Sequence, residues 1–361
     1  MGLTVAIDAR AAAEVTAGRG RYVRQLLLAL AELPEAADDR YVLLARQPWG
    51  ELDERFSWEI VSLPDPAWHV AAALVASRRA DVLLSTNSYL TAWFATVPTA
   101  VVVYDLVAFA AGARAQSRAA RIERATIRPG LRRARALPCI SEATRADLVG
   151  RFPSAAAKAS VIPLAASERF SAAQPDDVAA RHGLSSPYAL AVGTLEPRKN
   201  LERLLAAWMR LPAHVRDAHA LALVGPRGWE GDAIMRAAEG AGAHVLGRVS
   251  DEDLAALYAG CAVFAYPSLY EGFGLPVLEA MSAGAPVVTS TVSSLPEVAG
   301  DAAILVDPLD TDAISDAIAR VLTDPALAQR LAEDGRRRAG AFSWEHTARD
   351  TRQLLAAIAR R

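Results

Sequence analysis

The chain alternates short apolar runs with segments whose apolar residues recur at helical spacing, and it does so twice. In the first half we predict a helix over 20–33 and buried strands over 3–9, 41–45, 81–85, 99–104 and 137–141. The pattern starts again at residue 188, after a segment, 171–187, that is rich in Ala, Ser, Asp and Pro. Strands that alternate with helices favour parallel sheets covered by helices on both faces.

The second half repeats this alternation without repeating the sequence. We predict strands over 188–193, 220–224, 244–246, 262–266, 286–289 and 303–306, and helices over 201–211, 233–240, 251–259, 275–283 and 313–322. The tail from residue 325 is predicted to be helical, with a break near 340–343. These elements predict an α/β chain with two Rossmann-like domains, residues 1–175 and 184–342. Ligands are expected in a cleft between the carboxyl ends of their strands.

Composition excludes several classes of protein. A chain of 361 residues with 52% hydrophobic and 22% charged residues is neither disordered nor fibrous. Its two cysteines, Cys139 and Cys261, exclude a disulfide scaffold and favour a reduced, cytoplasmic setting. The net charge of -2 gives no general attraction to nucleic acid. No leader pattern is recognised and the apolar runs are too short to span a bilayer, so the protein can touch a membrane but is not expected to cross one.

Residues 271–279, Glu-Gly-Phe-Gly-Leu-Pro-Val-Leu-Glu, follow a predicted strand and open a predicted helix. Glycine lets the backbone approach a ligand closely, and the first N–H groups of the helix, at Gly274 and Leu275, attract phosphate. Glu279 lies one turn into the helix, where it can accept hydrogen bonds from a ribose diol. Glu271 precedes the helix, where it can hold sugar hydroxyls. The alternative is an ordinary glycine-containing turn with two surface glutamates.

A second motif, residues 193–200, follows the first strand of the second half. Arg198 and Lys199 would project over the same edge of the sheet, where guanidinium and ammonium groups bind phosphate oxygens. Lysine occurs only at positions 158 and 199 among 39 basic residues, which favours a specific role for Lys199. The alternative is a solvated turn in which Asn200 is an ordinary N-cap.

Cofactor and metal motifs are weak. The loop Ala17-Gly18-Arg19-Gly20-Arg21-Tyr22 lacks the third glycine of a dinucleotide fingerprint, so a nicotinamide cofactor is disfavoured. The six histidines form no pair with ligand spacing. The acidic run 251–253 fits a capping box opened by Ser250 better than a metal site. We therefore expect neither a cofactor nor a metal.

Together, these motifs resemble the retaining glycosyltransferases of family 4, which have the GT-B fold of two Rossmann-like domains with mainly parallel sheets facing across a cleft. Glu271 and Glu279 match the family's Glu-x7-Glu motif. Residues 195–200, Leu-Glu-Pro-Arg-Lys-Asn, are most similar to bacterial mannosyl- and rhamnosyltransferases of surface-polysaccharide pathways. Other segments that carry the resemblance are 18–22, 139–144, 161–164, 223–225, 247–250, 266–270, 286–289 and 295–297.

The resemblance implies a role for each matching residue. The catalytic residues would be Arg198 and Lys199 on the donor diphosphate and Glu271 on the donor sugar, with Glu279 on the ribose. The other donor-binding residues would be Gly18, Gly20, Gly193, Thr194, Arg248, Val249, Phe273, Gly274 and Leu275. The acceptor side would hold Tyr104, Asp105 and Ser141. The last helix, 343–361, would pack back on the first domain.

The implied activity is retaining transfer of a mannose- or rhamnose-type hexose from a nucleotide diphosphate sugar to a glycan or lipid-linked acceptor. We expect same-face attack, in which the leaving phosphate takes the acceptor's proton and no metal or protein nucleophile is needed. Many relatives have histidine where this chain has Tyr104, and tyrosine, with a pKa of about 10, cannot serve as a neutral-pH switch. This departure leaves open a non-catalytic donor-binding or scaffold subunit. A sugar-nucleotide epimerase of the same architecture also stays open.

An arginine-rich segment stands apart from these motifs. Arginines at 114, 118, 121, 128, 132 and 135 fall on one face of a predicted helix, which Pro129-Gly130 would kink or divide. Such a face favours peripheral contact with an anionic membrane, here the inner face of the cell membrane, or with a lipid-linked diphosphate. The alternative is a solvated face in an arginine-rich protein.

Overall fold

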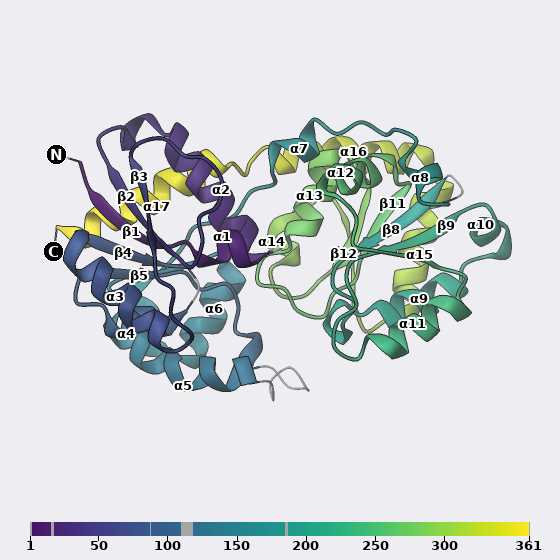
Figure 1. The fold of residues 1–361 in the computed structure, drawn as a ribbon. Helices are drawn as coiled ribbons and strands as arrows, with labels where there is room; N and C mark the ends of the chain where they lie inside the picture. The colour runs from purple at the N-terminus through teal and green to yellow at the C-terminus, as the bar shows by residue number, and fades with distance from the viewer. Residues whose placement is uncertain (1, 16–17, 87, 110–117, 185–186, 361) are drawn as a thin grey trace. The chain divides into compact units, whose positions relative to one another are not determined.

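The computed structural model describes residues 2–15, 18–86, 88–109, 118–184 and 187–360. The chain divides into two compact units, Met1–Leu164 with Ser343–Arg361, and Ala165–Phe342 (Figure 1). Each unit has its own parallel sheet with helices packed against it. No described helix combines the length and the apolar character needed to cross a membrane.

The first unit contains a five-stranded parallel sheet in the order β3-β2-β1-β4-β5. Its strands are β1 (Thr4–Asp8), β2 (Arg40–Ala45), β3 (Phe56–Ile60), β4 (Val82–Ser85) and β5 (Thr99–Val101). A separate parallel pair joins β6 (Leu137–Cys139) and β7 (Ala159–Val161). The edge strand β3 was not predicted from the sequence, because only its first residue is fully buried and the apolar signal is weak.

Helices surround this sheet. They are α1 (Arg10–Glu14), α2 (Arg19–Glu32), α3 (Ala67–Arg79), α4 (Tyr89–Phe94), α5 (Arg118–Arg133), α6 (Glu142–Arg151) and α17 (Trp344–Ala359), with short 3-10 turns at Pro34–Ala36, Val107–Phe109 and Pro153–Lys158. The carboxy-terminal helix α17 packs against α2, and Arg352 donates from Nε to Asp39 at 2.6 Å (Figure 1). The prediction that Pro129-Gly130 divides the arginine-rich helix is wrong in part, because α5 continues through Pro129 to Arg133.

The second unit contains a six-stranded parallel sheet in the order β10-β9-β8-β11-β12-β13. Its strands are β8 (Tyr188–Val192), β9 (Ala220–Val224), β10 (His244–Gly247), β11 (Val263–Tyr266), β12 (Val287–Ser290) and β13 (Ile304–Val306). Each lies within a residue or two of its predicted bounds. The four inner strands β8, β9, β11 and β12 were predictable because most of their residues are buried and apolar, as parallel strands covered on both faces require.

The helices of the second unit also follow the sequence pattern. They are α7 (Glu168–Ser171), α8 (Val178–Arg181), α9 (Leu201–Met209), α10 (Ala213–Asp217), α11 (Gly231–Gly240), α12 (Asp251–Gly260), α13 (Leu275–Ala283), α14 (Leu295–Ala299), α15 (Thr311–Thr323) and α16 (Pro325–Ala339), with a 3-10 turn at Pro197–Lys199. Figure 1 shows α9, α11 and α15 on one side of the sheet and α12 and α13 on the other. Leu204 and Trp208 of α9 and Ile318 of α15 belong to the hydrophobic core of this unit.

The boundary between the units lies earlier than predicted. It falls after Leu164, so residues 165–175 belong to the second unit and not to the first. Two short helices at the start of the second unit pack against α12: Phe170 of α7 and Val178 of α8 both bury their side chains. Arg169 donates to Asp251 at 2.8 Å, which attaches α7 to the start of that helix.

Candidate active site

The two motifs of the second half meet at one place in the second sheet. The strand order reverses between β8 and β11, since β9 and β10 extend the sheet on one side and β12 and β13 on the other. Ligands of open parallel sheets bind at the carboxyl ends of the strands where this reversal occurs. Residues 193–200 leave β8 there, and residues 267–274 leave β11.

Glu271 is the centre of the side-chain cluster at this reversal. Its Oε1 accepts hydrogen bonds from Lys199 Nζ at 2.6 Å, Tyr266 Oη at 2.8 Å and Ser268 Oγ at 2.7 Å. Its Oε2 accepts from Arg198 Nη1 at 2.7 Å. Burial raises the pKa of Glu271, but the charges of Lys199 and Arg198 outweigh burial and bring the pKa to about 2. The carboxylate is therefore ionised and held by four donors.

The two cations are fixed by acidic and carbonyl partners. Arg198 donates from Nε and Nη2 to Glu196 Oε1, at 3.0 and 2.8 Å, and from Nη1 to the Tyr270 carbonyl at 2.7 Å as well as to Glu271. Lys199 donates to Tyr266 Oη at 2.5 Å and to Glu271. Within the described residues, each cation retains one N–H group that these bonds do not use.

Glu196 was not identified from the sequence as part of the site. It is 5% exposed and, with Glu271, balances the charges of Arg198 and Lys199, so the cluster of four side chains is formally neutral. Nothing in its position two residues before Arg198 indicates that the two side chains face each other. The contact depends on the turn Pro197–Lys199, which folds the segment back.

Backbone conformation positions Lys199 at the end of this turn. Asn200 is in the left-handed region, with φ of 60°, and its Nδ2 donates to the carbonyls of Pro267 at 2.9 Å and Pro308 at 2.7 Å. The interpretation of Asn200 as an ordinary N-cap is wrong, because its side chain makes no cap hydrogen bond. Instead it joins the loops that follow β8, β11 and β13. Gly193, with φ of 150°, passes so close that a Cβ there would lie 3.1 Å from Lys199 Cε.

The start of α13 lies in the same loop as Glu271. Gly274 has φ of 105°, and a Cβ at this residue would lie 2.7 Å from Leu295 Cδ2. Ser294 Oγ donates to the carbonyls of Glu271 at 3.0 Å and Phe273 at 2.8 Å, which fixes the loop before the helix. In the described part of the chain, no protein acceptor takes the N–H groups of Gly274 or Leu275. These groups are oriented donors at the positive end of a helix.

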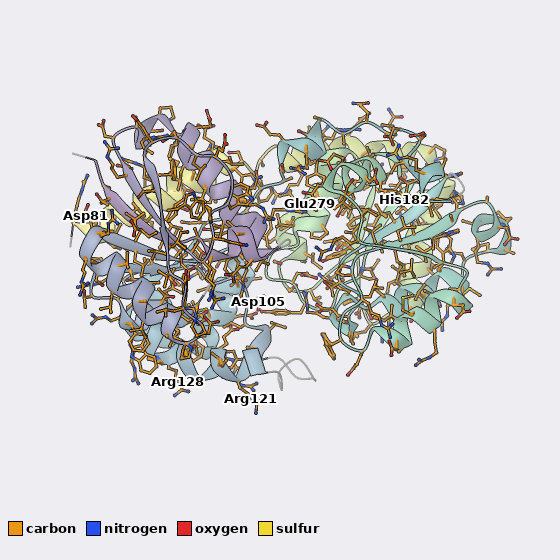
Figure 2. All side chains as sticks on the ribbon, in the orientation of Figure 1. Asp81, Asp105, Arg121, Arg128, His182 and Glu279 are labelled. Atoms are coloured by element: carbon orange, nitrogen blue, oxygen red, sulfur yellow. The ribbon has the colours of Figure 1, made fainter. Side chains whose placement is uncertain are left out.

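Glu279 lies one turn into α13, as predicted, but it is not a surface residue. It is 2% exposed, and Tyr258 Oη donates to its Oε2 at 3.3 Å. Figure 2 labels it on α13. Glu271 is 8% exposed, so the alternative of two surface glutamates is wrong for both residues. Phe273 is also buried, with its ring edge-on to Phe342 at 5.9 Å.

The remaining second-unit residues of the prediction lie at the same sheet edge. Thr194 is half-buried in the loop after β8. Arg248 is exposed and Val249 is half-buried directly after β10. The carbonyl of Gly247 accepts from Gly225 N at 2.7 Å, so the turns that follow β10 and β9 are joined.

The two glycines predicted in the first unit, Gly18 and Gly20, differ in how tightly their surroundings are packed. Gly18 precedes α2 with φ of 52°, and a Cβ added there would have no atom within 4 Å. Gly20 is required by packing, because a Cβ there would lie 1.6 Å from the Val15 carbonyl oxygen. The close approach at Gly20 is therefore made by the protein's own backbone.

The predicted acceptor-side residues also lie in the first unit. The Tyr104 hydroxyl is buried with no hydrogen-bond partner among the described residues, and burial raises its pKa well above the usual value. Asp105 Oδ1 accepts from Val107 N at 2.9 Å, and Ser141 Oγ caps α6 by accepting from Thr144 N at 3.0 Å. The structure thus gives Ser141 a local structural role. All three belong to the first unit, whereas the described members of the Glu271 cluster belong to the second.

In the part of the chain that the structure describes, no three His, Cys, Asp or Glu side chains gather as metal ligands. Ser250 Oγ accepts from Asp253 N at 3.0 Å, which confirms the predicted helix cap at the acidic run 251–253. Asp310 likewise caps α15. These carboxylates at helix starts are accounted for by local hydrogen bonds and ion pairs.

Comparison with curated proteins places the second unit in a known family. The family described as glycosyl transferases group 1 matches residues 176–338. The O-antigen chain mannosyltransferase B of Escherichia coli is 49% identical over 168 residues, which are 45% of this chain and 44% of that protein. The chain spans less than half the length of the first curated relatives that it matches.

Solved structures resemble the whole chain. Sucrose-phosphate synthase from Thermosynechococcus elongatus has a TM-score of 0.80 at 24% identity, over 98% of this chain and 100% of that one. Anabaena HepE in complex with UDP-glucose has a TM-score of 0.76 at 16% identity, over 98% and 100%. The chain therefore has the GT-B fold of glycosyltransferases, and its residues 176–338 match the glycosyl transferases group 1 family.

Proposed function

We propose that the chain is a glycosyltransferase that moves a mannose-type hexose from a nucleotide diphosphate sugar to a glycan or lipid-linked acceptor. The observation that carries this proposal is the convergence of Arg198 and Lys199 on Glu271 beside the start of α13. The mannose preference is supported by the similarity to an O-antigen mannosyltransferase, and the nucleotide sugar by the similarity to a structure that holds UDP-glucose.

The geometry suits stabilisation of a departing diphosphate. Breaking the bond between the anomeric carbon and the phosphate places negative charge on the leaving group, and preplaced donors stabilise that charge. Arg198 and Lys199 each keep an N–H group for this purpose, and the N–H groups of Gly274 and Leu275 add to them. Since Glu271 and Glu196 already fix both cations, little rearrangement is needed when the donor binds.

Glu271 is suited to holding the donor sugar and poorly suited to attacking it. With a pKa of about 2 and four hydrogen-bond donors, its carboxylate is a weak base and a weak nucleophile. We therefore favour retention by same-face attack, with the proton passing to the leaving phosphate. The N–H groups that Arg198 and Lys199 keep would hydrogen-bond the leaving diphosphate in place of a metal ion, so the proposed reaction is metal-independent.

Nucleotide binding and turnover test this function separately. We expect one of UDP, GDP, dTDP and ADP to raise the melting temperature clearly more than the others, because tight binding to the folded state stabilises it. Lys199→Ala and Glu279→Ala should each reduce that rise. The matching sugar donor should then be turned over, and NMR should show a product that keeps the donor's anomeric configuration.

The possible outcomes separate the alternatives. An inverted product would refute retention, and nucleotide binding without turnover on any acceptor would favour a donor-binding subunit. Conversion of the donor without an acceptor would favour an epimerase. A full nucleotide response in both variants would show that the site is wrongly placed. Because a lipid-linked acceptor lies at a membrane surface, we extend the proposal to peripheral membrane contact by the segment 114–135.

A further inference from the structure

The positive charge of the first unit is concentrated in one stretch of the chain. Residues 67–135 contain ten arginines, no lysine and three acidic residues, whereas the whole chain has a net charge of -2. Acidic residues therefore outnumber lysine and arginine in the rest of the protein. This stretch includes α3, α4 and α5, which pack against one another in the order α3, α4, α5. Arg114 lies outside the described residues.

Two stacked aromatic side chains are exposed beside this charge. Trp93 and Phe94, at the end of α4, are 46% and 41% exposed, and their rings stack with centroids 5.5 Å apart. They are the exposed large aromatic side chains among the described residues. Leu74 on α3 and Ile122 on α5 are exposed as well. Clustered apolar side chains on a surface mark a place where something binds.

Two contacts show that α4, which ends in Trp93 and Phe94, lies against the arginine-rich helix α5. Arg133 Nε donates to the carbonyl of Ala95 at 2.9 Å, directly after Phe94. Gly130 lets α5 approach α4 closely, since a Cβ there would lie 2.7 Å from Tyr89 Cβ. Figure 2 shows Arg121 and Arg128 at the outer edge of α5. The arginines at 121, 128, 132, 133 and 135 are exposed.

We propose that the face made by α4 and α5 docks on an anionic lipid bilayer, with Trp93 and Phe94 inserted among the headgroups and the α5 arginines paired with lipid phosphates. This deepens the membrane contact of the proposed function and rests on it. Aromatic side chains favour the membrane interface and arginines favour anionic headgroups, so the two features together fit a bilayer. The acidic remainder of the chain is repelled by the same surface, which orients this face toward it.

Vesicle co-sedimentation of the full chain, without donor, tests the docking. We expect binding to vesicles of phosphatidylcholine with about one-third phosphatidylglycerol, loss of binding to pure phosphatidylcholine, and weakening by salt. The double variant Arg121→Glu/Arg132→Glu should weaken binding at least tenfold. Trp93→Ser/Phe94→Ser should weaken it several-fold while the salt dependence stays. The matched controls in the second unit, Arg330→Glu and Leu309→Ser, should bind as the wild type does.

Fluorescence provides a second measurement. Addition of anionic vesicles should shift the tryptophan emission to the blue, and Trp93→Phe should abolish most of that shift. Equal binding to neutral and anionic vesicles, no binding to either, or equal loss in the control variants would each overturn the proposal. The nucleotide-induced rise in melting temperature should be unchanged in all α4 and α5 variants, so a failure of docking is distinguishable from a failure of the donor site.

Discussion

Each unit has a buried carboxylate beside the reversal of strand order in its sheet, and the surroundings of the two carboxylates have opposite effects on their charge. In the first unit, Asp8 ends β1, beside the reversal of strand order between β1 and β4. In the second unit, Glu271 follows β11, beside the reversal between β8 and β11. Asp8 Oδ1 has no hydrogen-bond partner among the described residues, and Oδ2 accepts a long bond of 3.4 Å from Thr91 Oγ1.

The electrostatic consequence is a difference in protonation. Burial raises the pKa of Asp8 to about 6, although the nearby charge of Arg10 opposes this. Arg10 is itself paired with Asp65 at 2.7 Å. The pKa of Glu271 is about 2 because Lys199 and Arg198 both face it. Similar sheets thus provide similar locations, but the neighbouring cations decide whether a carboxylate there is permanently charged. Of these two carboxylates, Glu271 is the one that accepts hydrogen bonds directly from an arginine and a lysine.

The largest effect is expected from removing one of those cations. Lys199→Ala deletes an ammonium group that is buried and bonded to Glu271 at 2.6 Å. We expect kcat/KM for donor transfer to fall by about 10²- to 10³-fold, the usual cost of losing one preplaced donor to developing charge. The chain offers a matched control in its only other lysine, because Lys158 donates to backbone carbonyls of residues 131, 132 and 134. Lys158→Ala should leave the nucleotide response intact, and equal losses in both variants would contradict the comparison.

The opposite pKa shifts predict opposite pH dependences of stability. The pKa of Asp8 is raised in the folded state, so its burial costs stability at all pH values above about 6, and the cost disappears as pH falls from 6 to 4. Asp8→Asn should therefore raise the free energy of unfolding at pH 7.5 by about 2 to 3 kcal/mol and leave it nearly unchanged at pH 4.

Glu271 should show the reverse. Its folded-state pKa is lowered, so it contributes stability above pH 4.5 that is lost as pH falls toward 2. Glu271→Gln should destabilise the protein by roughly 3 kcal/mol at pH 7.5 and by less below pH 4. Urea unfolding at several pH values measures both variants. If the change in the free energy of unfolding were independent of pH in both variants, the two carboxylates would not differ in charge state.

A smaller effect is expected from Glu196, which positions Arg198 without being expected to touch the donor. Glu196→Gln keeps the shape of the side chain but weakens two charge-assisted bonds to Arg198. We expect kcat to fall roughly tenfold with little change in KM for the donor, because the guanidinium is misplaced and not removed. Steady-state kinetics at several donor concentrations separates the two parameters. A selective rise in KM would instead assign Glu196 to donor binding.

The sequence predicted the second sheet better than the cluster built on it. Strands such as β9 and β12 were predictable because continuous burial leaves a continuous apolar run. Arg198, Lys199 and Glu271 were found as candidates because charged residues follow two predicted strands. Their mutual pairing was not predictable, since Lys199 and Glu271 lie 72 residues apart and meet only through the strand order.

Other misses have local physical causes. Asn200 suits both an N-cap and a left-handed backbone, and sequence cannot distinguish the two. The segment containing α7 and α8 carries few apolar residues, so the burial of Phe170 and Val178 gave no periodic pattern. Asp8 lies in a predicted strand, but the side chain that donates to it, Thr91, comes from α4, so the surroundings of this carboxylate depend on packing across 83 residues of chain.

The smallest effect on stability is expected from removing a tyrosine hydroxyl, and each unit offers one for comparison. Tyr266 Oη lies between Lys199 at 2.5 Å and Glu271 at 2.8 Å, so Tyr266→Phe should cost about 1 to 2 kcal/mol of stability. The Tyr104 hydroxyl is buried without a partner among the described residues, so Tyr104→Phe should leave the melting temperature unchanged or slightly higher. If Tyr104 contacts the acceptor as proposed, the same variant should still lower the transfer rate several-fold. A drop in melting temperature equal to that of Tyr266→Phe would contradict the contrast between the units, and an unchanged transfer rate would remove Tyr104 from the acceptor side.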